Sequence, residues 1–218
     1  MNLEEIFSED PRVKEVYNYA KAKYQEEDLE QHNWEHIVGN LYRALNIAET
    51  EEDVDYSILT VAVLFHDIGV TKGEYENHEE NSVKIAEREL PNYGFSDEEV
   101  EEIVPCLETV GEEEDSETIE AKICSDADKL AKSGFASVFN FFRVQKELGR
   151  PLEEFSSSTS KYSTSKYERL DEIGFYTDKA EEISNDGFKE RIEFIQKFHE
   201  KLKERPDFTA TEEDLKNI

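Results

Sequence analysis

The stretch Ile58-Leu59-Thr60-Val61-Ala62-Val63-Leu64-Phe65-His66-Asp67-Ile68-Gly69 decides the fold. Its first eight residues are nearly all apolar, which is typical of a helix that is buried on every side. The run then passes directly into a histidine and an aspartate, and a glycine marks the loop that follows. The pattern therefore predicts a central helix, from about Asp55 to Asp67, with two metal-binding side chains at its end.

The segments on both sides of this stretch also have a helical period, and none alternates as a strand does. Asp10-Pro11 is typical of an N-cap followed by proline at the first helical position. Ser96-Asp97-Glu98-Glu99 has the pattern of a capping box. Further helices are expected from about His32 to Glu49 and, as a long amphipathic helix, from about Asp178 to Lys203. We predict an all-α protein, a single compact bundle of about 8–9 helices with a long C-terminal helix.

The charge of the chain excludes several classes of partner. Its 218 residues include 54 acidic and 25 basic side chains, which gives a formal net charge of −29. Such a charge repels nucleic acids and anionic membrane surfaces. We find no apolar run of about 18 residues that could span a membrane. Because Cys106 and Cys124 lack a CxxC spacing and no signal peptide is evident, we expect a cytoplasmic protein with reduced thiols.

Histidine and aspartate recur around the central stretch at positions that suit a metal site. His36 lies upstream of His66-Asp67, and Asp126 lies downstream in Ser125-Asp126-Ala127-Asp128-Lys129-Leu130. The order is H…HD…D, with the ligands supplied by three helices. Neutral imidazole nitrogens and ionised carboxylates are common metal ligands. The set predicts one divalent ion, Mn, Fe, Co, Ni, Zn or Mg, and does not distinguish among them.

These motifs resemble those of the HD-domain metal-dependent phosphohydrolases, in particular a small stand-alone branch. The first matching stretches are His32-Asn33-Trp34-Glu35-His36, Leu64-Phe65-His66-Asp67-Ile68-Gly69 and Asp126-Ala127-Asp128-Lys129-Leu130. Others are His78 with Ser82, Ala86 and Leu90, then Leu148-Gly149-Arg150-Pro151, and Glu172-Ile173-Gly174-Phe175-Tyr176-Thr177. The resemblance implies a single HD domain over residues 1–218, with a core of about 28–150 and a helical extension of about 151–204.

The resemblance also implies the ligands and the reaction. His36, His66, Asp67 and Asp126 would hold the metal ion. The reaction would be the hydrolysis of a phosphoester or phosphoanhydride, in a nucleotide or another small phosphorylated substrate. Metal-bound water is the nucleophile in such reactions, and the ion polarises the phosphoryl oxygen. The sequence predicts neither a nucleic-acid nor a membrane partner, and it does not determine the oligomeric state.

Further residues are candidates for catalysis and substrate binding. With Asp67, we assign catalytic roles to His78, as a proton handler, and to Lys129, which lies three residues after Asp126 and so near its helical face. Lys129, Lys72 and Arg43 are candidate phosphate-binding cations. The chain departs from the family at Val70, where several HD phosphohydrolases carry an acidic residue. Glu74 and Glu79 are alternative proton handlers.

Alternatives from other classes of protein remain open. His32-Asn33-Trp34-Glu35-His36 also fits the H-x-x-E-H motif of a zinc protease. Val70 favours a non-catalytic module that binds a metal ion or a nucleotide without turning it over. An HD-fold oxygenase with two irons needs more histidines than this chain offers. A purely structural role would leave the spacing of His36, His66-Asp67 and Asp126 without a reason.

Overall fold

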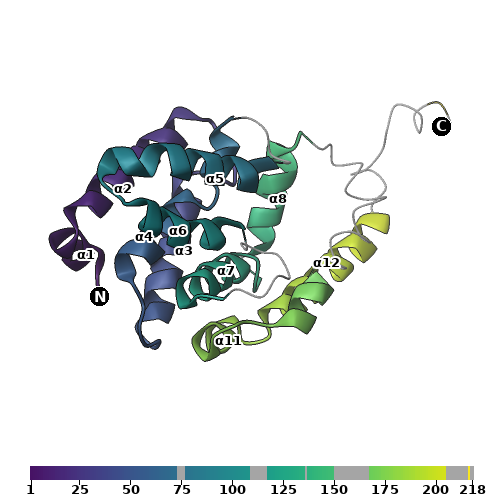
Figure 1. Ribbon diagram of the computed structural model, residues 1–218. Helices are drawn as coiled ribbons and strands as arrows, with labels where there is room; N and C mark the ends of the chain where they lie inside the picture. Colours follow the sequence, from purple (N-terminus) through teal and green to yellow (C-terminus); the bar gives the residue numbers. More distant parts are fainter. Residues whose placement is uncertain (73–76, 109–116, 136, 150–166, 205–215, 217–218) are drawn as a thin grey trace. The chain divides into compact units, whose positions relative to one another are not determined.

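A computed structural model of the chain describes residues 1–72, 77–108, 117–135, 137–149, 167–204 and 216. Within these residues the chain forms helices, 3-10 turns and loops without a strand, so the predicted all-α class is confirmed (Figure 1). The helices are α1 (Leu3–Glu9), α2 (Pro11–Glu26), α3 (Trp34–Ala48), α4 (Tyr56–Phe65), α5 (His78–Glu89), α6 (Asp97–Glu108), α7 (Ile119–Ala131), α8 (Ser137–Glu147), α11 (Asp178–Ser184) and α12 (Gly187–Lys203), with 3-10 helices η1 (Ile68–Lys72) and η3 (Leu90–Tyr93). None of these described helices is long and apolar enough to cross a membrane.

Helix α4 is the centre of the fold, as its apolar sequence predicts. Every residue from Ile58 to Phe65 is buried. The helix packs against α2, α3, α6 and α7, so apolar side chains are needed on all of its faces. Full burial of each large aliphatic or aromatic side chain stabilises the fold by roughly 1.5–3 kcal/mol. This packing fixes the end of α4, and with it the place of His66 and Asp67.

Local capping interactions begin the helices where the sequence predicts them. The Asp10 side chain accepts a hydrogen bond from the Arg12 backbone N–H and caps α2, which begins at Pro11. Ahead of α6, the Ser96 hydroxyl accepts from the Glu99 backbone N–H at 3.2 Å. The Glu99 carboxylate accepts in return from the Ser96 backbone N–H at 2.7 Å. Each capped end satisfies donors that a helix leaves unpaired.

The chain divides into two compact units. The first contains residues Met1–Ala131 and Phe175–Ile183, and the second contains Lys132–Gly174 and Ser184–Ile218. The core of the first unit is formed mainly by α2, α3, α4, α6 and α7, and Ala180 of α11 joins it. The single-domain organisation, with a core of 28–150 and an extension of 151–204, stays a prediction.

The long C-terminal helix differs from its predicted bounds. Instead of one helix from about residue 178 to 203, α11 ends at Ser184 and α12 begins at Gly187. Between them, Asn185 and Asp186 have φ angles of 43° and 64°, in the left-handed region that ends a helix. A Cβ atom on Gly187 would lie 2.1 Å from the Ser133 hydroxyl oxygen, so this position requires glycine. This long-range contact leaves no periodic signal in the sequence.

Candidate metal centre

Three predicted ligands lie together in the first unit. Ligand atoms of His36, His66 and Asp67 all lie within 4.8 Å of one another. The Asp67 Oδ2 atom is 3.0 Å from His66 Nε2 and 3.2 Å from His36 Nε2. These side chains are at most 8% exposed. Helix α3 supplies the first histidine, and the end of α4 supplies the other two residues.

A hydrogen-bonded clamp holds the turn that carries His66 and Asp67. The Ser82 hydroxyl donates to the His66 carbonyl oxygen at 3.0 Å and accepts from the Gly69 backbone N–H at 2.9 Å. A Cβ atom on Gly69 would lie 1.9 Å from the His78 carbonyl oxygen. Only glycine therefore allows α5 to approach this closely. The contact brings His78, the first residue of α5, beside Asp67.

Hydrogen bonding prepares His66 to bind a cation. Its Nδ1 atom lies 2.7 Å from the Val63 carbonyl oxygen, which can only accept, so the ring proton is on Nδ1. The lone pair of Nε2 then faces the Asp67 Oδ2 atom 3.0 Å away. A proton or a metal ion between Nε2 and Oδ2 would attract both atoms, and the Asn40 amide nitrogen also lies 3.0 Å from Nε2. With His36, Nε2 and Oδ2 form the mixed nitrogen and oxygen donor set that divalent metal ions prefer.

Burial and the neighbouring charges shift the pKa values of these three residues in opposite directions. Burial lowers the pKa of His36, and the nearby Asp67 only partly opposes this. For His66 burial also works against protonation, but the attraction and hydrogen bonding of Asp67 outweigh it and raise the pKa. Burial works against ionisation of Asp67, yet His66 and His36 hold the pKa of this carboxyl well below its usual value. The carboxylate is therefore ionised and able to bind a metal ion.

The carboxylate of Asp126, the fourth predicted ligand, is hydrogen-bonded to residues outside the His36–His66–Asp67 group. It accepts hydrogen bonds from the backbone N–H of Tyr176 at 3.0 Å and of Thr177 at 2.8 Å. It also accepts one from the Thr177 hydroxyl at 2.8 Å. Burial raises the pKa of Asp126, and these hydrogen bonds oppose the shift. The carboxylate of Asp126, on α7, thus contacts the turn before α11 and is not part of the His36–His66–Asp67 group.

Asp128 is the carboxylate of α7 that faces the histidines. Its Oδ1 atom lies 3.8 Å from His36 Nε2, and its side chain is only 8% exposed. Residues two positions apart on a helix point about 200° apart, so Asp126 and Asp128 cannot face the same group. The stretch Asp126-Ala127-Asp128 contains both carboxylates, and only Asp126 was predicted as a ligand.

Two further histidines lie near this group, His78 beside Asp67 and His32 beside His36 and His78. The Nε2 atom of His78 lies 3.6 Å from Asp67 Oδ1, so each oxygen of this carboxylate faces imidazole. The His32 ring centroid is 6.3 Å from that of His78 and 5.8 Å from that of His36. His78 was predicted as a site residue. His32 was not, although its spacing of four residues from His36 was a signal of proximity.

The predicted cations differ in their surroundings. Arg43 donates through Nε to the Ala127 carbonyl oxygen at 2.9 Å and through Nη2 to the Asn40 side-chain oxygen. Lys129 is 1% exposed, and its Nζ atom lies 4.4 Å from the centroid of the Tyr176 ring. Lys72 ends η1, and its side chain lies outside the part of the chain that the structure describes. Arg43 and Lys129 are thus built into the fold around α7.

The zinc-protease interpretation does not agree with the local geometry. Helix α3 begins at Trp34, so His32 precedes the helix that carries His36. The H-x-x-E-H motif requires both histidines on one helical face. Glu35, the general base in that interpretation, is exposed. His36 instead groups with His66 and Asp67.

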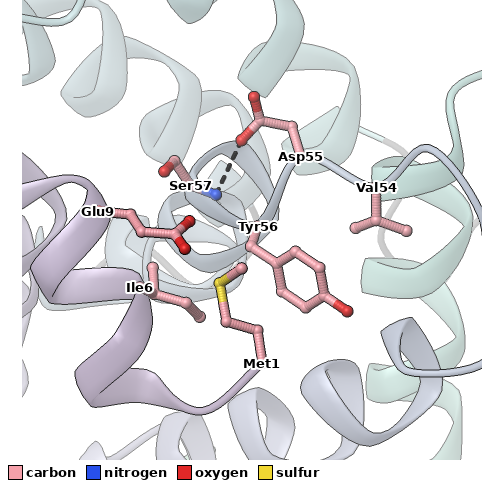
Figure 2. A pocket seen from close by; sticks show the side chains of 7 residues that line it. All are labelled: Met1, Ile6, Glu9, Val54, Asp55, Tyr56 and Ser57. Atoms are coloured by element: carbon pink, nitrogen blue, oxygen red, sulfur yellow. Dashed lines mark hydrogen bonds between the residues drawn. The ribbon is translucent and has the colours of Figure 1, made fainter.

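A separate pocket of about 290 Å³ lies in the first unit, and no histidine is among its lining residues. Its lining comes from α1, the chain start and the start of α4: Met1, Ile6, Glu9, Val54, Asp55, Tyr56 and Ser57 (Figure 2). Figure 2 shows the Asp55 carboxylate accepting from the Ser57 backbone N–H, at 2.8 Å, so this carboxylate caps α4. The carboxylates of Glu9 and Asp55 make the pocket unfavourable for a phosphate.

The fold and the site together define a helical protein with a buried His–His–Asp group that suits a metal ion. Residues 33–133 match the family model of the HD domain, which spans the three grouped ligands and Asp128. This segment of the chain thus matches the HD domain, and the predicted resemblance to the HD-domain family is confirmed. Family and site together support a metal-dependent hydrolase in general.

Solved structures share this fold. A predicted HD superfamily hydrolase from an uncultured Thermotogales bacterium has a TM-score of 0.62 at 22% identity, over 93% of this chain and 99% of that one. Bacillus subtilis YpgQ in complex with ADP has a TM-score of 0.65 at 20% identity, over 88% and 95%. A protein from Lactobacillus plantarum has a TM-score of 0.70 at 15% identity, over 89% and 98%. No curated protein matches the sequence.

Proposed function

We propose that the protein is a metal-dependent phosphohydrolase acting on a nucleotide or another small phosphoester or phosphoanhydride. The buried group of His36, His66 and Asp67 carries this proposal, because its nitrogen and carboxylate donors converge within 4.8 Å. A nucleotide is the favoured substrate class, because YpgQ, which shares the fold, was solved with ADP.

We assign the metal ion to His36, His66, Asp67 and Asp128. Asp128 takes the role predicted for Asp126, because it is the α7 carboxylate that lies 3.8 Å from His36. When bound, a divalent ion supplies an activated water and polarises the phosphoryl oxygen. The donors do not choose among Mn, Fe, Co, Ni, Zn and Mg.

The other residues of the site handle protons and phosphate. His78 is 20% exposed whereas His66 is 1% exposed, so His78 is better placed to exchange protons with substrate and solvent. His32 stands beside it as a second imidazole. Because the chain has a net charge of −29, a phosphate needs local cations. Arg43, Lys129 and Lys72 are the candidates, and in this proposal Arg43 and Lys129 act mainly through their charge.

Metal analysis combined with a hydrolysis screen tests the proposal. Protein purified without chelator is loaded with Mn, Co, Ni or Zn, and nucleoside di- and triphosphates and small phosphoesters are offered. Wild type should bind about one metal ion and release phosphate or pyrophosphate. Asp67→Ala should lose both properties, because it removes the carboxylate shared by His36 and His66. Asp28→Ala, the same change at an exposed aspartate, should keep both.

One feature favours a non-catalytic alternative. Val70 is 4% exposed and belongs to the apolar interior, at the position where the family resemblance implies an acidic residue. A module that only binds would retain metal and ADP but release no phosphate with any metal ion tested. Hydrolysis retained in Asp67→Ala would instead assign the activity to another site.

A further inference from the structure

We propose that Gln31 is a positioning residue that keeps the ring proton of His36 on Nδ1, so that Nε2 is free to bind the metal ion. This proposal rests on the proposed metal site, and Gln31 is not one of the site residues predicted from the sequence. Gln31 is 5% exposed and lies three residues before α3 begins. Its side-chain amide nitrogen and His36 Nδ1 are 3.2 Å apart.

The proton on His36 has two competing positions. On Nε2 it would point at Asp67 Oδ2, 3.2 Å away, and at Asp128 Oδ1, 3.8 Å away. Two carboxylates therefore favour the tautomer that blocks the metal-binding nitrogen. A neutral imidazole binds a metal only through its unprotonated nitrogen. The other tautomer is favoured by a group that donates to Nε2 or by a group that accepts from Nδ1–H.

The hydrogen bonds of Asn40 indicate the tautomers of His36 and His66. Its side-chain nitrogen lies 3.0 Å from His36 Nε2 and 3.0 Å from His66 Nε2. Arg43 donates to the oxygen of the same amide, which keeps the NH₂ group directed at both rings. An amide NH₂ can only donate, so both Nε2 atoms accept and both rings carry their proton on Nδ1.

The two Nδ1 atoms then need acceptors. For His66 the acceptor is the Val63 carbonyl oxygen, at 2.7 Å. For His36 the group at this position is the Gln31 amide. Rotation of the amide by 180° exchanges its oxygen and nitrogen within almost the same shape, and only the oxygen can accept from Nδ1–H. The structure places the amide nitrogen of Gln31 at Nδ1, so Gln31 plays for His36 the part that Val63 plays for His66 only when its amide is rotated to bring the oxygen there. Metal-binding histidines are commonly oriented by such an acceptor.

Gln31 and its neighbour His32 approach His36 from different sides. His32 approaches His36 through its ring, at 5.8 Å between centroids, and occupies the side toward His78. Gln31 approaches the ring nitrogen that points away from Asp67. Replacing Gln31 should therefore change how His36 binds a metal ion, without removing any ligand.

The test measures tautomers without a metal ion and affinity with one. In ¹⁵N-labelled protein without metal, at a pH about two units above the ordinary histidine pKa of about 6.5, wild-type His36 should show a protonated Nδ1. Gln31→Leu should move the proton wholly or partly to Nε2 and weaken Mn or Co binding by about 10- to 100-fold in a titration. Gln31→Glu, whose carboxylate accepts from Nδ1–H, should keep the wild-type tautomer and at least the wild-type affinity. Gln25→Leu, at an exposed glutamine of α2, serves as the matched control.

The outcomes separate this inference from the proposed function. An unchanged ¹⁵N pattern in Gln31→Leu overturns the inference, whatever the protein hydrolyses. A wild type that binds no metal defeats the proposed function, and the ¹⁵N pattern alone then decides the role of Gln31. If Gln31→Leu does not fold, Gln31→Met carries the test, because its unbranched chain fills a similar space.

Discussion

The two aspartates of α7 have the same chemistry and similar burial but opposite surroundings. Asp126 is 0% exposed and is surrounded by N–H and O–H donors of Tyr176 and Thr177. Asp128 is 5% exposed and lies beside the imidazole of His36. A buried carboxylate is tolerated only when it is hydrogen-bonded, paired or bound to metal. The comparison teaches that the partner of a buried aspartate, and not its burial, indicates its role.

The largest loss of hydrolysis should come from replacing Asp128, the aspartate that faces the histidines. Asp128→Asn removes the negative charge near His36 while keeping the shape of the side chain. Loss of a residue that only orients a ligand commonly costs 10- to 100-fold, so loss of a ligand should lower hydrolysis by about a hundredfold or more. Steady-state kinetics and metal titration provide the measurement.

Asp126→Asn is the matched control for this change. It makes the same substitution two residues away on the same helix and should leave metal affinity within about threefold of wild type, because its side chain faces the other side of α7. The reverse result would be loss of metal binding in Asp126→Asn and retained binding in Asp128→Asn. It would show that Asp126, and not Asp128, is the metal ligand.

A second prediction concerns stability. Asp126→Ala removes the acceptor of the partly buried Tyr176 N–H and of the buried Thr177 N–H. Hydrogen bonds to a charged group contribute about 1.5–3 kcal/mol each, and a buried donor left unpaired costs about 1–3 kcal/mol. We expect the free energy of unfolding to fall by roughly 2–5 kcal/mol in urea denaturation. A loss below about 0.5 kcal/mol would mean that Asp126 does not anchor this turn.

The sequence predicted the local part of this arrangement and missed the part that depends on distant contacts. Apolar residues on every face of α4 predict a central helix, and adjacency alone brings His66 and Asp67 to its end. The H…HD…D order indicates His36, and the helical period of its segment places it on a helix. Each of these predictions rests on neighbours in the chain, which composition and spacing report directly.

The choice between Asp126 and Asp128 rests on a contact with residues about fifty positions away. Tyr176 and Thr177 occupy one of the two carboxylates, and no local pattern announces this. The approach of His32 to His78 and the break before Gly187 were not predicted for a similar reason. Each depends on which segments meet in space: His32 beside His78, and Gly187 beside Ser133.

The smallest predicted effect tests whether the Asp126 side of α7 is purely structural. Thr177→Val removes a single hydroxyl that donates to Asp126 at 2.8 Å and accepts from the Ala180 backbone N–H at 3.3 Å. The backbone N–H of residue 177 keeps its bond to the carboxylate, so only about 1–2 kcal/mol of unfolding free energy should be lost. Thr177→Ser, which keeps the hydroxyl, should recover most of it. Metal affinity should be the same in all three proteins, because the hydroxyl contacts Asp126 and the Ala180 backbone, neither of which belongs to the His36–His66–Asp67 group. A change in metal affinity that follows the hydroxyl would show that the two faces of α7 are coupled, and the separation of roles between Asp126 and Asp128 would then be wrong.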